Sequence, residues 1–506
     1  MLLSKFNLKN INADKVAVSD EALFDLPEKV LQFGTGVLLR GLPDYFIDKA
    51  NKQGIFNGRI VVVKSTDGGD ATAFDKQDGL YTICVRGIEE GKKQEENIIC
   101  SSISRVLSAK TEWNKILECA HNPQMKVIIS NTTEVGIELV QDDIKRYPPV
   151  SFPGKLLSFL YERYKAFAGS KQSGMVIVPT ELIVDNGKKL ESIVTELAYL
   201  NALEESFIDW LENSNTFCNS LVDRIVPGKP DTIQKTKIEN EVGYSDELLI
   251  MTEVYRLWAI EGGAEVAEVL SFAKADAEGV VITPDINLFR ELKLRLLNGT
   301  HTLSCGVAFL SGFATVKEAT DDEQMAGFMS NVMQDEIAAA IPYTTTPAQT
   351  TEFSVKCLDR FRNPFIEHQW IAITAQYSSK MKLRVVPVLK QYYALYHAVP
   401  ENMAVGFAAY FYFMKAVKEE NGKYYGMLNG SYYPVNDAKA SWFYEKWQTT
   451  LLALIAASVL GDVTLWDCDL CTLPGFAEAV QEKLIEIDET GMAAVLDPLQ
   501  SKKSIA

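Results

Sequence analysis

The stretch ELKLRLLNGTHT combines three polar side chains whose types suit proton transfer, namely Lys293, Asn298 and His301. A partly buried lysine can exchange a proton near neutral pH, and an asparagine amide can donate to a carbonyl or alkoxide oxygen. The histidine can hydrogen-bond the same oxygen or a neighbouring hydroxyl. In a continuous α-helix, at about 100° per residue, Asn298 would lie roughly 140° and His301 roughly 80° around from Lys293. The spacing predicts that all three side chains lie on one side of a helix.

The same stretch has a second interpretation, in which the helix carries no chemistry. It could expose the lysine, end at Asn298–Gly299 and bury a histidine whose hydrogen bonds are satisfied. An Asn-Gly step inside a helix costs roughly 1 kcal/mol of helix propensity, and either a functional constraint or a helix end would explain it. Spacing alone leaves both interpretations open.

The elements that would position such a site begin with a nucleotide-binding pattern. Lys29–Phe33 is a short apolar run that leads into GTGVLLRGLPDYF. A buried strand, a glycine turn and then a helix open a dinucleotide-binding unit, where Gly34 and Gly36 let the backbone approach a pyrophosphate. The third glycine of the usual fingerprint is absent, because Leu39 stands in its place. Taken alone, this pattern would also fit a generic strand–turn–helix.

Further strands are expected at Arg59–Lys64, Lys126–Ser130 and Met175–Pro179, alternating with helical stretches such as Glu112–Ala120. This alternation predicts a mainly parallel sheet with ligands at its carboxyl edge. The segments DGLYTICVRG and NIICSSISRVLS, between the second and third of these strands, resemble a β insertion. We expect the following residues to bind the cofactor: Phe33, Gly34, Thr35, Gly36, Val37, Asp67, Asn131 and Thr132.

The residues after the second strand bear on the choice of cofactor. Asp67 could bind the ribose hydroxyls of NAD, whereas Lys64 could face the 2′-phosphate of NADP. We favour NAD. From about Asn287 onward helical periodicity dominates and strand-like runs are rare, with expected helices such as Ala404–Val417 and Trp442–Val459. The predicted fold is therefore α/β: a Rossmann-like NAD-binding domain over residues 1–285, and a mainly α-helical substrate and catalytic domain over residues 286–506.

Composition excludes several classes of function. The formal net charge of −17 argues against a nucleic-acid or anionic-membrane partner, because phosphate neutralisation needs a basic field. The first 20 residues lack the apolar segment of a secretory signal, and no apolar run approaches the ~18 residues of a membrane span. Four dispersed histidines predict no metal site, and eight scattered cysteines favour reduced thiols, with Cys468 and Cys471 more typical of a structural than a redox pair. We expect a cytoplasmic protein with a small-molecule substrate.

Several motifs together resemble the polyol-specific long-chain dehydrogenases, also called the mannitol dehydrogenase family. Lys-x4-Asn-x2-His matches at Lys293, and FGTGVLLRG resembles G-x-G-x-F-x-R, although Leu38 replaces the aromatic residue. FCNSLVDRIVP resembles the signature around V-D-R-I-x-P, from which Asn215 departs, and RFRNPFIEHQW resembles R-F-x-N-P. The resemblance spans roughly residues 25–490.

The resemblance implies a role for each matching residue. Lys293 would be the general acid/base, Asn186 and Asn298 would polarise the carbonyl, and His301 would hold the substrate. Asp223, in the V-D-R motif, would either contact the polar end of the substrate or pair with a neighbouring arginine. QFGTGVLLRG, SNTTEVGI, PTELIVDNG and SSKMKLRVVP look most like family members that act on a uronate. The expected reaction is NADH-dependent reduction of D-tagaturonate to D-altronate, in the breakdown of galacturonate.

A uronate differs from a neutral polyol in its carboxylate, which a guanidinium can bind with two hydrogen bonds. We expect His368, Lys380 and Arg384 to contribute to substrate binding; the alternative is a solvated charged face. Other substrates also fit the family, namely fructuronate or a neutral ketose such as fructose, as in mannitol 2-dehydrogenase. A nucleotide-binding sensor without turnover is an alternative of another class, although such a protein need not keep proton-transfer residues.

Overall fold

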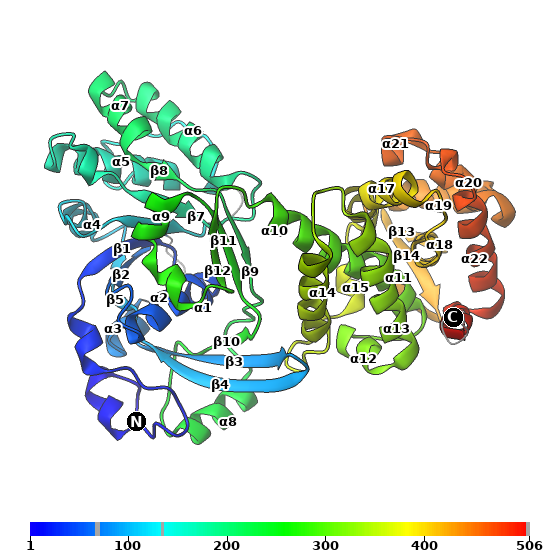
Figure 1. The fold of residues 1–506 in the computed structure, drawn as a ribbon, viewed down its shortest axis with the longest axis horizontal. Coiled ribbons are helices and arrows are strands. Elements are labelled where there is room, and N and C mark those ends of the chain that lie inside the picture. Colours follow the sequence, from blue (N-terminus) through cyan, green and yellow to red (C-terminus); the bar gives the residue numbers. More distant parts are fainter. Residues whose placement is uncertain (66–70, 133–135, 502–506) are drawn as a thin grey trace. The chain divides into compact units, whose positions relative to one another are not determined.

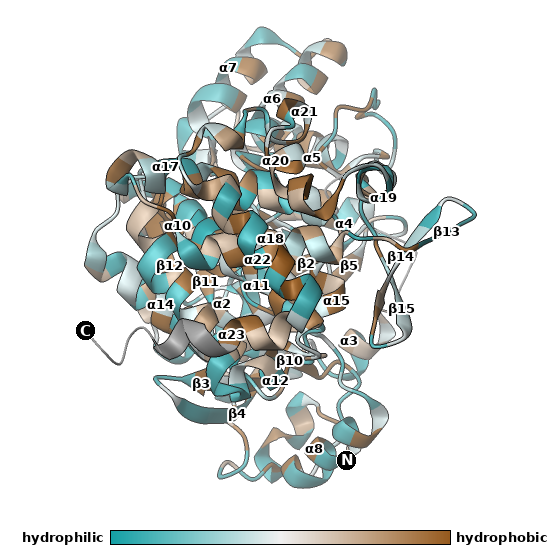
Figure 2. Cartoon of the chain, turned by 90° about the vertical axis from the view of Figure 1, so that its right-hand side faces the viewer, coloured by the Kyte–Doolittle hydropathy of each residue, from teal (hydrophilic) through white to brown (hydrophobic). Residues whose placement is uncertain are grey.

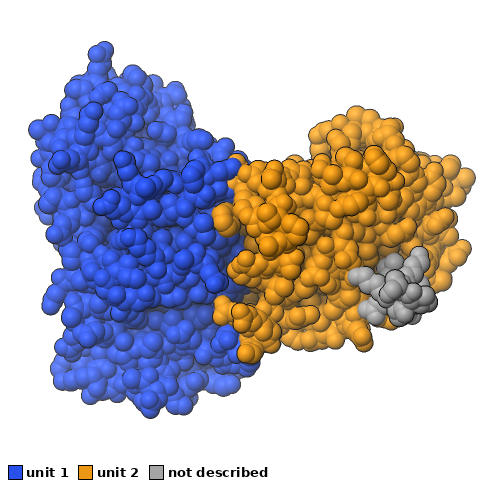
Figure 3. Space-filling view, viewed as in Figure 1, with its two compact units in different colours: residues 1–87, 93–286 blue, residues 88–92, 287–506 orange. Residues whose placement is uncertain are grey.

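The computed structural model describes residues 1–65, 71–132 and 136–501, and the side chains of these up to residue 496. Contacts within the chain divide it into two units, shown in separate colours in Figure 3. The first unit comprises Met1–Gly87 and Lys93–Ile286, and the second comprises Ile88–Lys92 and Asn287–Ala506. None of the helices in the described ranges is both long enough and apolar enough to span a bilayer.

Six parallel strands form the main sheet of the first unit (Figure 1), in the order β5-β2-β1-β6-β7-β8. This is the Rossmann strand order, in which successive strands are added on one side of β1 up to β5 and on its other side from β6 onward. The central strands β2, β6 and β7 follow runs rich in β-branched apolar residues that are buried on both faces. Their bounds are Glu28–Phe33 (β1), Arg59–Lys64 (β2), Ile103–Ser108 (β5), Val127–Ser130 (β6), Val176–Pro179 (β7) and Thr216–Phe217 (β8).

Alternate side chains of β1 and β2 enter two separate cores. Val30 faces a core shared with α1 (Val37–Gly41) and α2 (Pro43–Lys52). Leu31 faces the other core, against four helices. This alternation is the period of two expected for a strand covered on both faces. The four helices are α4 (Trp113–Cys119), α5 (Phe152–Ala166), α6 (Asn186–Leu200) and α7 (Glu205–Ser214).

The predicted β insertion is only partly correct. Strands β3 (Tyr81–Glu89) and β4 (Lys92–Cys100) do form a separate sheet, together with β10 (Ile250–Glu253). However, β5, the second half of NIICSSISRVLS, pairs in parallel with β2 and is the third strand of the main sheet. A further sheet contains β9 (Ser220–Asp223), β11 (Leu257–Glu261) and β12 (Val280–Thr283). Two helices, α8 (Thr232–Val242) and α9 (Ala264–Val269), complete this part of the unit.

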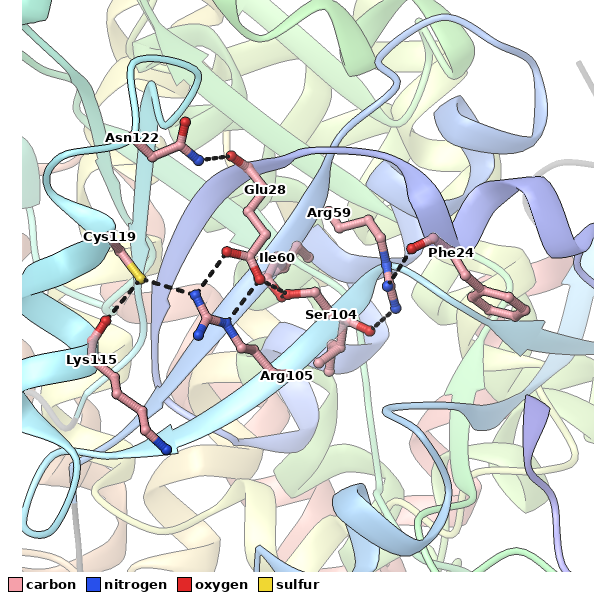
Figure 4. A network of polar contacts seen from close by, with 10 residues as sticks. Phe24, Glu28, Arg59, Ile60, Ser104, Arg105, Lys115, Cys119 and Asn122 are labelled. Atoms are coloured by element: carbon pink, nitrogen blue, oxygen red, sulfur yellow. Dashed lines mark hydrogen bonds and ion pairs between the residues drawn. The ribbon is translucent and has the colours of Figure 1, made fainter. Parts of the chain in front are cut away.

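Polar side chains join the amino ends of three main-sheet strands (Figure 4). The Arg105 guanidinium donates to both carboxylate oxygens of Glu28, each at 2.9 Å. Ser104 Oγ donates to Glu28 Oε1 at 2.8 Å and to the carbonyl of Ile60 at 2.9 Å. Side chains of β5 therefore link the starts of β1 and β2 at the edge opposite the glycine turn.

Helices dominate the second unit, and three of its segments are π-helical. The π segments are η6 (Lys293–Gly299), η7 (Val332–Ile337) and η9 (Met381–Val385), and η6 packs against both of the others. The larger helices are α11 (Thr300–Leu310), α13 (Glu323–Asn331), α14 (Pro347–Phe361), α17 (Val386–Tyr396), α18 (Glu401–Phe413), α19 (Ala440–Thr449) and α22 (Phe476–Thr490). The shorter ones are α10 (Asn287–Leu292), α12 (Val316–Asp321), α15 (Trp370–Ile373), α16 (Tyr377–Lys380), α20 (Ile455–Leu460), α21 (Val463–Trp466) and, at the end, α23 (Met492–Ser501).

Two of the expected helices are wrong in extent. The helix expected over Trp442–Val459 is interrupted between α19 and α20. The helix expected over Ala404–Val417 ends at Phe413, and a small antiparallel sheet follows it. Figure 2 shows this sheet as a ribbon that is teal near β13, where its residues are hydrophilic. Its strands are β13 (Lys418–Glu420), β14 (Lys423–Leu428) and β15 (Ser431–Pro434).

Candidate active site

The turn after β1 requires its first glycine. Gly34 has a φ of +127°, and a Cβ there would lie 2.9 Å from Leu39 Cδ1 and 3.0 Å from the carbonyl oxygen of Asn131. Its N–H donates to the carbonyl of Val63 at 3.0 Å, and the N–H of Asn131 donates to the carbonyl of Phe33 at 3.1 Å. The turn is thus held against β2 and β6 at the switch point of the sheet, where dinucleotides bind in Rossmann folds.

The second glycine leaves room at the start of the following helix. Gly36 precedes α1, is exposed, and would place a Cβ with no described atom within 4 Å. A pyrophosphate fits such a position, because a bare backbone with free N–H groups at a helix start can approach it closely. Thr35 and Val37 are half-buried beside it. Leu39, which replaces the third glycine, is fully buried and packs against the turn.

A buried carboxylate that sequence reasoning missed holds the loop after β6. Glu181, which is 3 % exposed, accepts from the N–H of Thr132 at 2.8 Å and from its hydroxyl at 3.1 Å. Its other oxygen accepts from Ser130 Oγ at 3.1 Å. Asn131 Nδ2 donates to Thr180 Oγ1 at 3.0 Å. The predicted cofactor residues Asn131 and Thr132 are therefore fixed by contacts to the end of β7; Asp67 lies outside the described residues.

Asn186 and Asp223 are both buried in the first unit. Asn186 Nδ2 donates to three backbone carbonyls at 3.0–3.1 Å, including that of Glu181, and its Oδ1 accepts from the N–H groups of Gly187 and Ser220. Its amide therefore ties together the loops after β7 and before β9. Asp223 ends β9, where its backbone pairs with Leu257.

The V-D-R motif also has a structural part. Arg224 donates from Nη1 to the carbonyl of Gly41 at 2.6 Å and from Nε to the carbonyl of Glu253 at 3.0 Å. The Tyr81 hydroxyl donates to the carbonyl of Arg40 at 3.0 Å. The last carbonyls of the five-residue helix α1 thus receive side-chain donors, which a helix end requires.

The candidate catalytic stretch is helical but not α-helical. Lys293 and Asn298 both lie in η6, and His301 follows in the first turn of α11. In a π-helix the backbone hydrogen bond joins residues five apart, so Asn298 lies about one turn after Lys293. The 140° separation expected from α-helical geometry is therefore wrong, and the two side chains are closer to one face. Lys293 and Asn298 are half-buried.

Aromatic and cationic side chains surround His301. Its ring centroid lies 4.3 Å from that of Phe361, 5.3 Å from that of His368 and 6.0 Å from that of Trp370. Burial, followed by the charges of His368, Arg360, Arg384 and Lys380, holds the pKa of His301 well below its usual value. The ring is therefore neutral near pH 7. Its Nε2 is shielded from solvent and has no hydrogen-bond partner among the described residues.

The structure brings the predicted substrate-binding residues of the second unit together. Burial and then the charge of Arg384 lower the pKa of Lys380, whose Nζ donates to the carbonyl of Ile373 at 2.8 Å. Burial and then the charges of Arg360 and Lys380 lower the pKa of His368. Arg384 Nη1 donates to Thr302 Oγ1 at 3.2 Å. We call Arg360, Lys380 and Arg384 the cationic cluster; the rings of His301 and His368, with their lowered pKa values, lie beside it. Within the described ranges, no group of three or more His, Cys, Asp and Glu side chains is arranged to hold a metal.

Comparisons with known proteins agree over nearly the whole chain. The mannitol dehydrogenase Rossmann domain matches residues 28–274, and the mannitol dehydrogenase C-terminal domain matches residues 285–488. An altronate oxidoreductase of Bacillus subtilis is 37% identical over 477 residues, covering 93% of this chain and 95% of that protein. An altronate oxidoreductase of Shigella flexneri is 36% identical over 484 residues, covering 94% and 97% respectively.

Solved structures share the fold at lower identity. A Pseudomonas fluorescens mannitol 2-dehydrogenase, in a ternary complex with NAD and D-mannitol, has a TM-score of 0.67 and 22% identity, covering 99% of this chain and 100% of that one. A substrate-free D-sorbitol dehydrogenase has a TM-score of 0.76 and 19% identity, covering 98% and 100%. The Rossmann domain implies a nicotinamide dinucleotide cofactor. The chain belongs to the mannitol dehydrogenase family.

Proposed function

We propose that this protein reduces the keto group of D-tagaturonate to D-altronate with NADH. The observation that carries the proposal is the identity of 35–37% to proteins named altronate oxidoreductase over 92–94% of the chain. A cytoplasmic location belongs to the same proposal, because all eight cysteines are free thiols, as is usual in reducing compartments.

The first unit would hold the cofactor through the glycine turn and the loop after β6. The pyrophosphate would lie over Gly34–Gly36, with Phe33, Val37, Asn131 and Thr132 beside it. When bound, NADH supplies the hydride that the reduction needs. The choice of NADH over NADPH is part of the proposal, with Asp67 as the expected partner of the ribose hydroxyls.

The second unit would supply the proton and orient the ketose. Lys293, as an ammonium, gives a proton to the alkoxide oxygen that forms when hydride reaches the keto carbon. Asn298, which is half-buried on the same π segment as Lys293, donates from its amide to the same oxygen. Neutral His301 can accept a hydrogen bond from a substrate hydroxyl at its unpartnered Nε2. Asn186, whose amide is fully used by backbone groups, would position the loops that carry Glu181 and Ser220 rather than contact the carbonyl.

The cationic cluster would bind the carboxylate of the uronate. Besides burial, the charge of Arg384 lowers the pKa of Lys380, and the charges of both residues lower the pKa of His301, so these two cations lie close together beside the histidine ring. A bound carboxylate would relieve the repulsion between the Lys380 ammonium and the Arg384 guanidinium. Asp223 is a further candidate for a contact to the polar end of the substrate.

A substrate panel tests the proposal. Oxidation of NADH and of NADPH is followed with D-tagaturonate, D-fructuronate and D-fructose as acceptors. We expect the highest kcat/KM for tagaturonate with NADH. A higher value for fructuronate or fructose would assign the chain to another substrate of its family. Tight NADH binding without oxidation in the presence of any of the three would indicate a nucleotide sensor.

A pair of substitutions tests the carboxylate site. Hydrogen bonds to charged groups contribute about 1.5–3 kcal/mol, so Lys380→Met and Arg384→Met should each raise KM for the uronate by roughly 10- to 100-fold. The matched control is Lys382→Met, since Lys382 lies between the two residues in sequence and pairs with Asp467 at 2.7 Å. The control should leave KM within about two-fold. Equal KM values in Lys380→Met and the control would contradict the assignment.

A further inference from the structure

The π segment η9 has a local cause that can be read from its hydrogen bonds. The N–H of Val386 donates to the carbonyl of Met381, five residues back. Pro387 follows, and proline has no N–H to offer the carbonyl four residues back, which is that of Leu383. The N–H that an α-helix would offer to the carbonyl of Leu383 is therefore missing, and a side-chain donor can take its place.

Arg295 supplies that donor from the other π segment. Its Nη1 donates to the carbonyl of Leu383 at 2.6 Å and to that of Arg384 at 3.0 Å. Its Nε donates to Glu291 Oε2 at 2.9 Å, which holds the guanidinium against its own helix. Arg295 is 6 % exposed, so water cannot easily replace these bonds.

A second link runs in the opposite direction. Arg384 Nη1 donates to Thr302 Oγ1 at 3.2 Å, and Thr302 Oγ1 donates to the carbonyl of Asn298 at 2.7 Å. A side chain of η6 thus holds the backbone of η9, while a side chain of η9 holds, through Thr302, the backbone of η6. The two links fix both the distance and the register between these segments.

We propose that Arg295 is a positioning residue, which sets the placement of Arg384 on η9, and of Lys380 at the end of α16 just before it, relative to Lys293 and Asn298 on η6. The inference rests on the proposed function, because those four residues are the ones that would hold the carboxylate and transfer the proton. In this proposal Arg295 acts through the backbone of η9 rather than through a contact to substrate or cofactor. Its planar fork reaches two adjacent carbonyls with one nitrogen while Nε stays on Glu291, a geometry that a lysine ammonium on a flexible stem does not reproduce.

Four variants separate positioning from stability alone: Arg295→Lys, Arg295→Met, Pro387→Ala and the double variant Arg295→Met with Pro387→Ala. In the double variant, the N–H of residue 387 can satisfy the Leu383 carbonyl, so η9 can become α-helical. The measurements are kcat and KM for the ketose, the Kd for NADH, the thermal unfolding midpoint and amide hydrogen exchange over residues 381–389.

For Arg295→Met we expect kcat to fall on the order of 100-fold, because a misplacement of about 1 Å has that effect, while the Kd for NADH stays within about two-fold. Exchange over residues 381–389 should rise, and Arg295→Lys should recover only part of kcat. The double variant should regain the unfolding midpoint but not kcat, since an α-helical η9 changes the rotation of Arg384 relative to Lys380, which precedes η9. Recovery of kcat together with the midpoint would overturn the proposal, and so would a kcat within two-fold of wild type in Arg295→Met.

The same measurements distinguish a wrong substrate assignment from a wrong role for Arg295. Lys382→Met, which removes a half-buried lysine paired with Asp467, serves as the control and should change neither kcat nor exchange. If the wild-type protein reduces a different ketose, the variants are assayed with that ketose, and the failure belongs to the substrate assignment. If the wild type reduces none, the proposed function fails. Exchange then decides the Arg295 inference, which is overturned if the rate over residues 381–389 does not change.

Discussion

The two units build their candidate sites from different materials. In the first unit the cofactor would meet mainly backbone, at a glycine turn held by hydrogen bonds to β2 and β6. In the second unit the substrate would meet side chains carried on helices that depart from α geometry. The first kind of site depends on space and backbone conformation, and the second on charge, proton transfer and helix register.

This difference predicts how each region responds to substitution. Replacing a side chain in the second unit should remove chemistry and leave the cofactor bound. Adding a side chain at the turn of the first unit should weaken cofactor binding and leave the proton-transfer groups intact. If substitutions in the second unit weakened cofactor binding, or substitutions at the turn removed proton transfer, the two units would not differ in this way.

Lys293→Met should have the largest effect. General acid–base catalysis contributes about 10²- to 10⁴-fold, so we expect kcat to fall by about 1,000-fold or more because the alkoxide lacks a proton donor. The Kd for NADH, from fluorescence titration, should stay within about two-fold. The control is Lys356→Met, which removes a lysine paired with Glu352 at 2.7 Å on α14. Full turnover in Lys293→Met would mean that the helix around Lys293 takes no part in catalysis.

Glu336 in the second unit should make stability depend on pH. Its carboxylate accepts from the N–H groups of Asn402 at 2.8 Å and Met403 at 2.7 Å, at the start of α18. Burial raises its pKa from 4.5 to about 7, against these hydrogen bonds. The folded state then holds a proton that the unfolded state has lost. Stability should therefore fall as pH rises from about 4.5 to about 7, by roughly 3 kcal/mol at about 1.4 kcal/mol per pKa unit.

Urea unfolding of the wild type and of Glu336→Gln at pH 5 and pH 8 measures this dependence. Glu336→Gln should be less stable at pH 5, because its amide group meets the N–H of Met403, but its stability should decline less toward pH 8. Parallel declines in the two proteins would show that Glu336 does not titrate in this range. Because the affected contacts lie at η7 and α18, the Kd for NADH should not follow the change.

Gly34→Ala tests the glycine turn of the first unit. The φ of +127° is strained for any residue with a Cβ, and that Cβ would press on Leu39 and on the carbonyl of Asn131. We expect a loss of about 2 kcal/mol of stability and at least a 10-fold rise in the Kd for NADH. Gly54→Ala is the matched control, since its φ is +68° but its Cβ would meet nothing within 4 Å. It should lose some stability without weakening NADH. Similar Kd values in the two variants would sink the idea that the space at the turn matters.

The first unit was the more predictable from sequence because its strands are local runs of β-branched residues. Arg59–Lys64 was expected as a strand and is β2 in full, and the glycine turn lies where the pattern indicated. Strand β5 was assigned to the insertion, because its position in the sheet depends on pairing with β2, which is distant in sequence. Glu181 was missed for a related reason: a single carboxylate carries no pattern until its partners are known.

The second unit was less predictable because its geometry depends on tertiary contacts. A π segment leaves no mark in α-helical periodicity, so the spacing of Lys293 and Asn298 was interpreted with the wrong angle. Pro387 indicated an irregularity in η9. However, Arg295, which donates to the carbonyl of Leu383, lies 88 residues away in sequence. The antiparallel sheet of β13, β14 and β15, which was not expected, had a local signal in the sequence. Its two turns are Asn421–Gly422 and Asn429–Gly430, and these four residues have positive φ, as expected for Asn-Gly turns between short strands.

Arg105→Met should have the smallest effect, and it tests whether the amino edge of the main sheet influences the cofactor site at the other edge. Arg105 and Glu28 form a two-bond ion pair at the amino edge of the same sheet that carries the glycine turn at its other edge. The Arg105 side chain is 43 % exposed, and exposed ion pairs contribute about 0–1 kcal/mol. We therefore expect less than about 1 kcal/mol of lost stability and no change in the Kd for NADH.

Arg59→Met is the matched contrast, because Arg59 is buried and donates to the carbonyls of Phe24 and Ile103. It should lose more stability, since those carbonyls would be left without donors. A change in NADH affinity in Arg105→Met would mean that the two edges of the sheet are coupled, and the cofactor site would then depend on more than the turn itself.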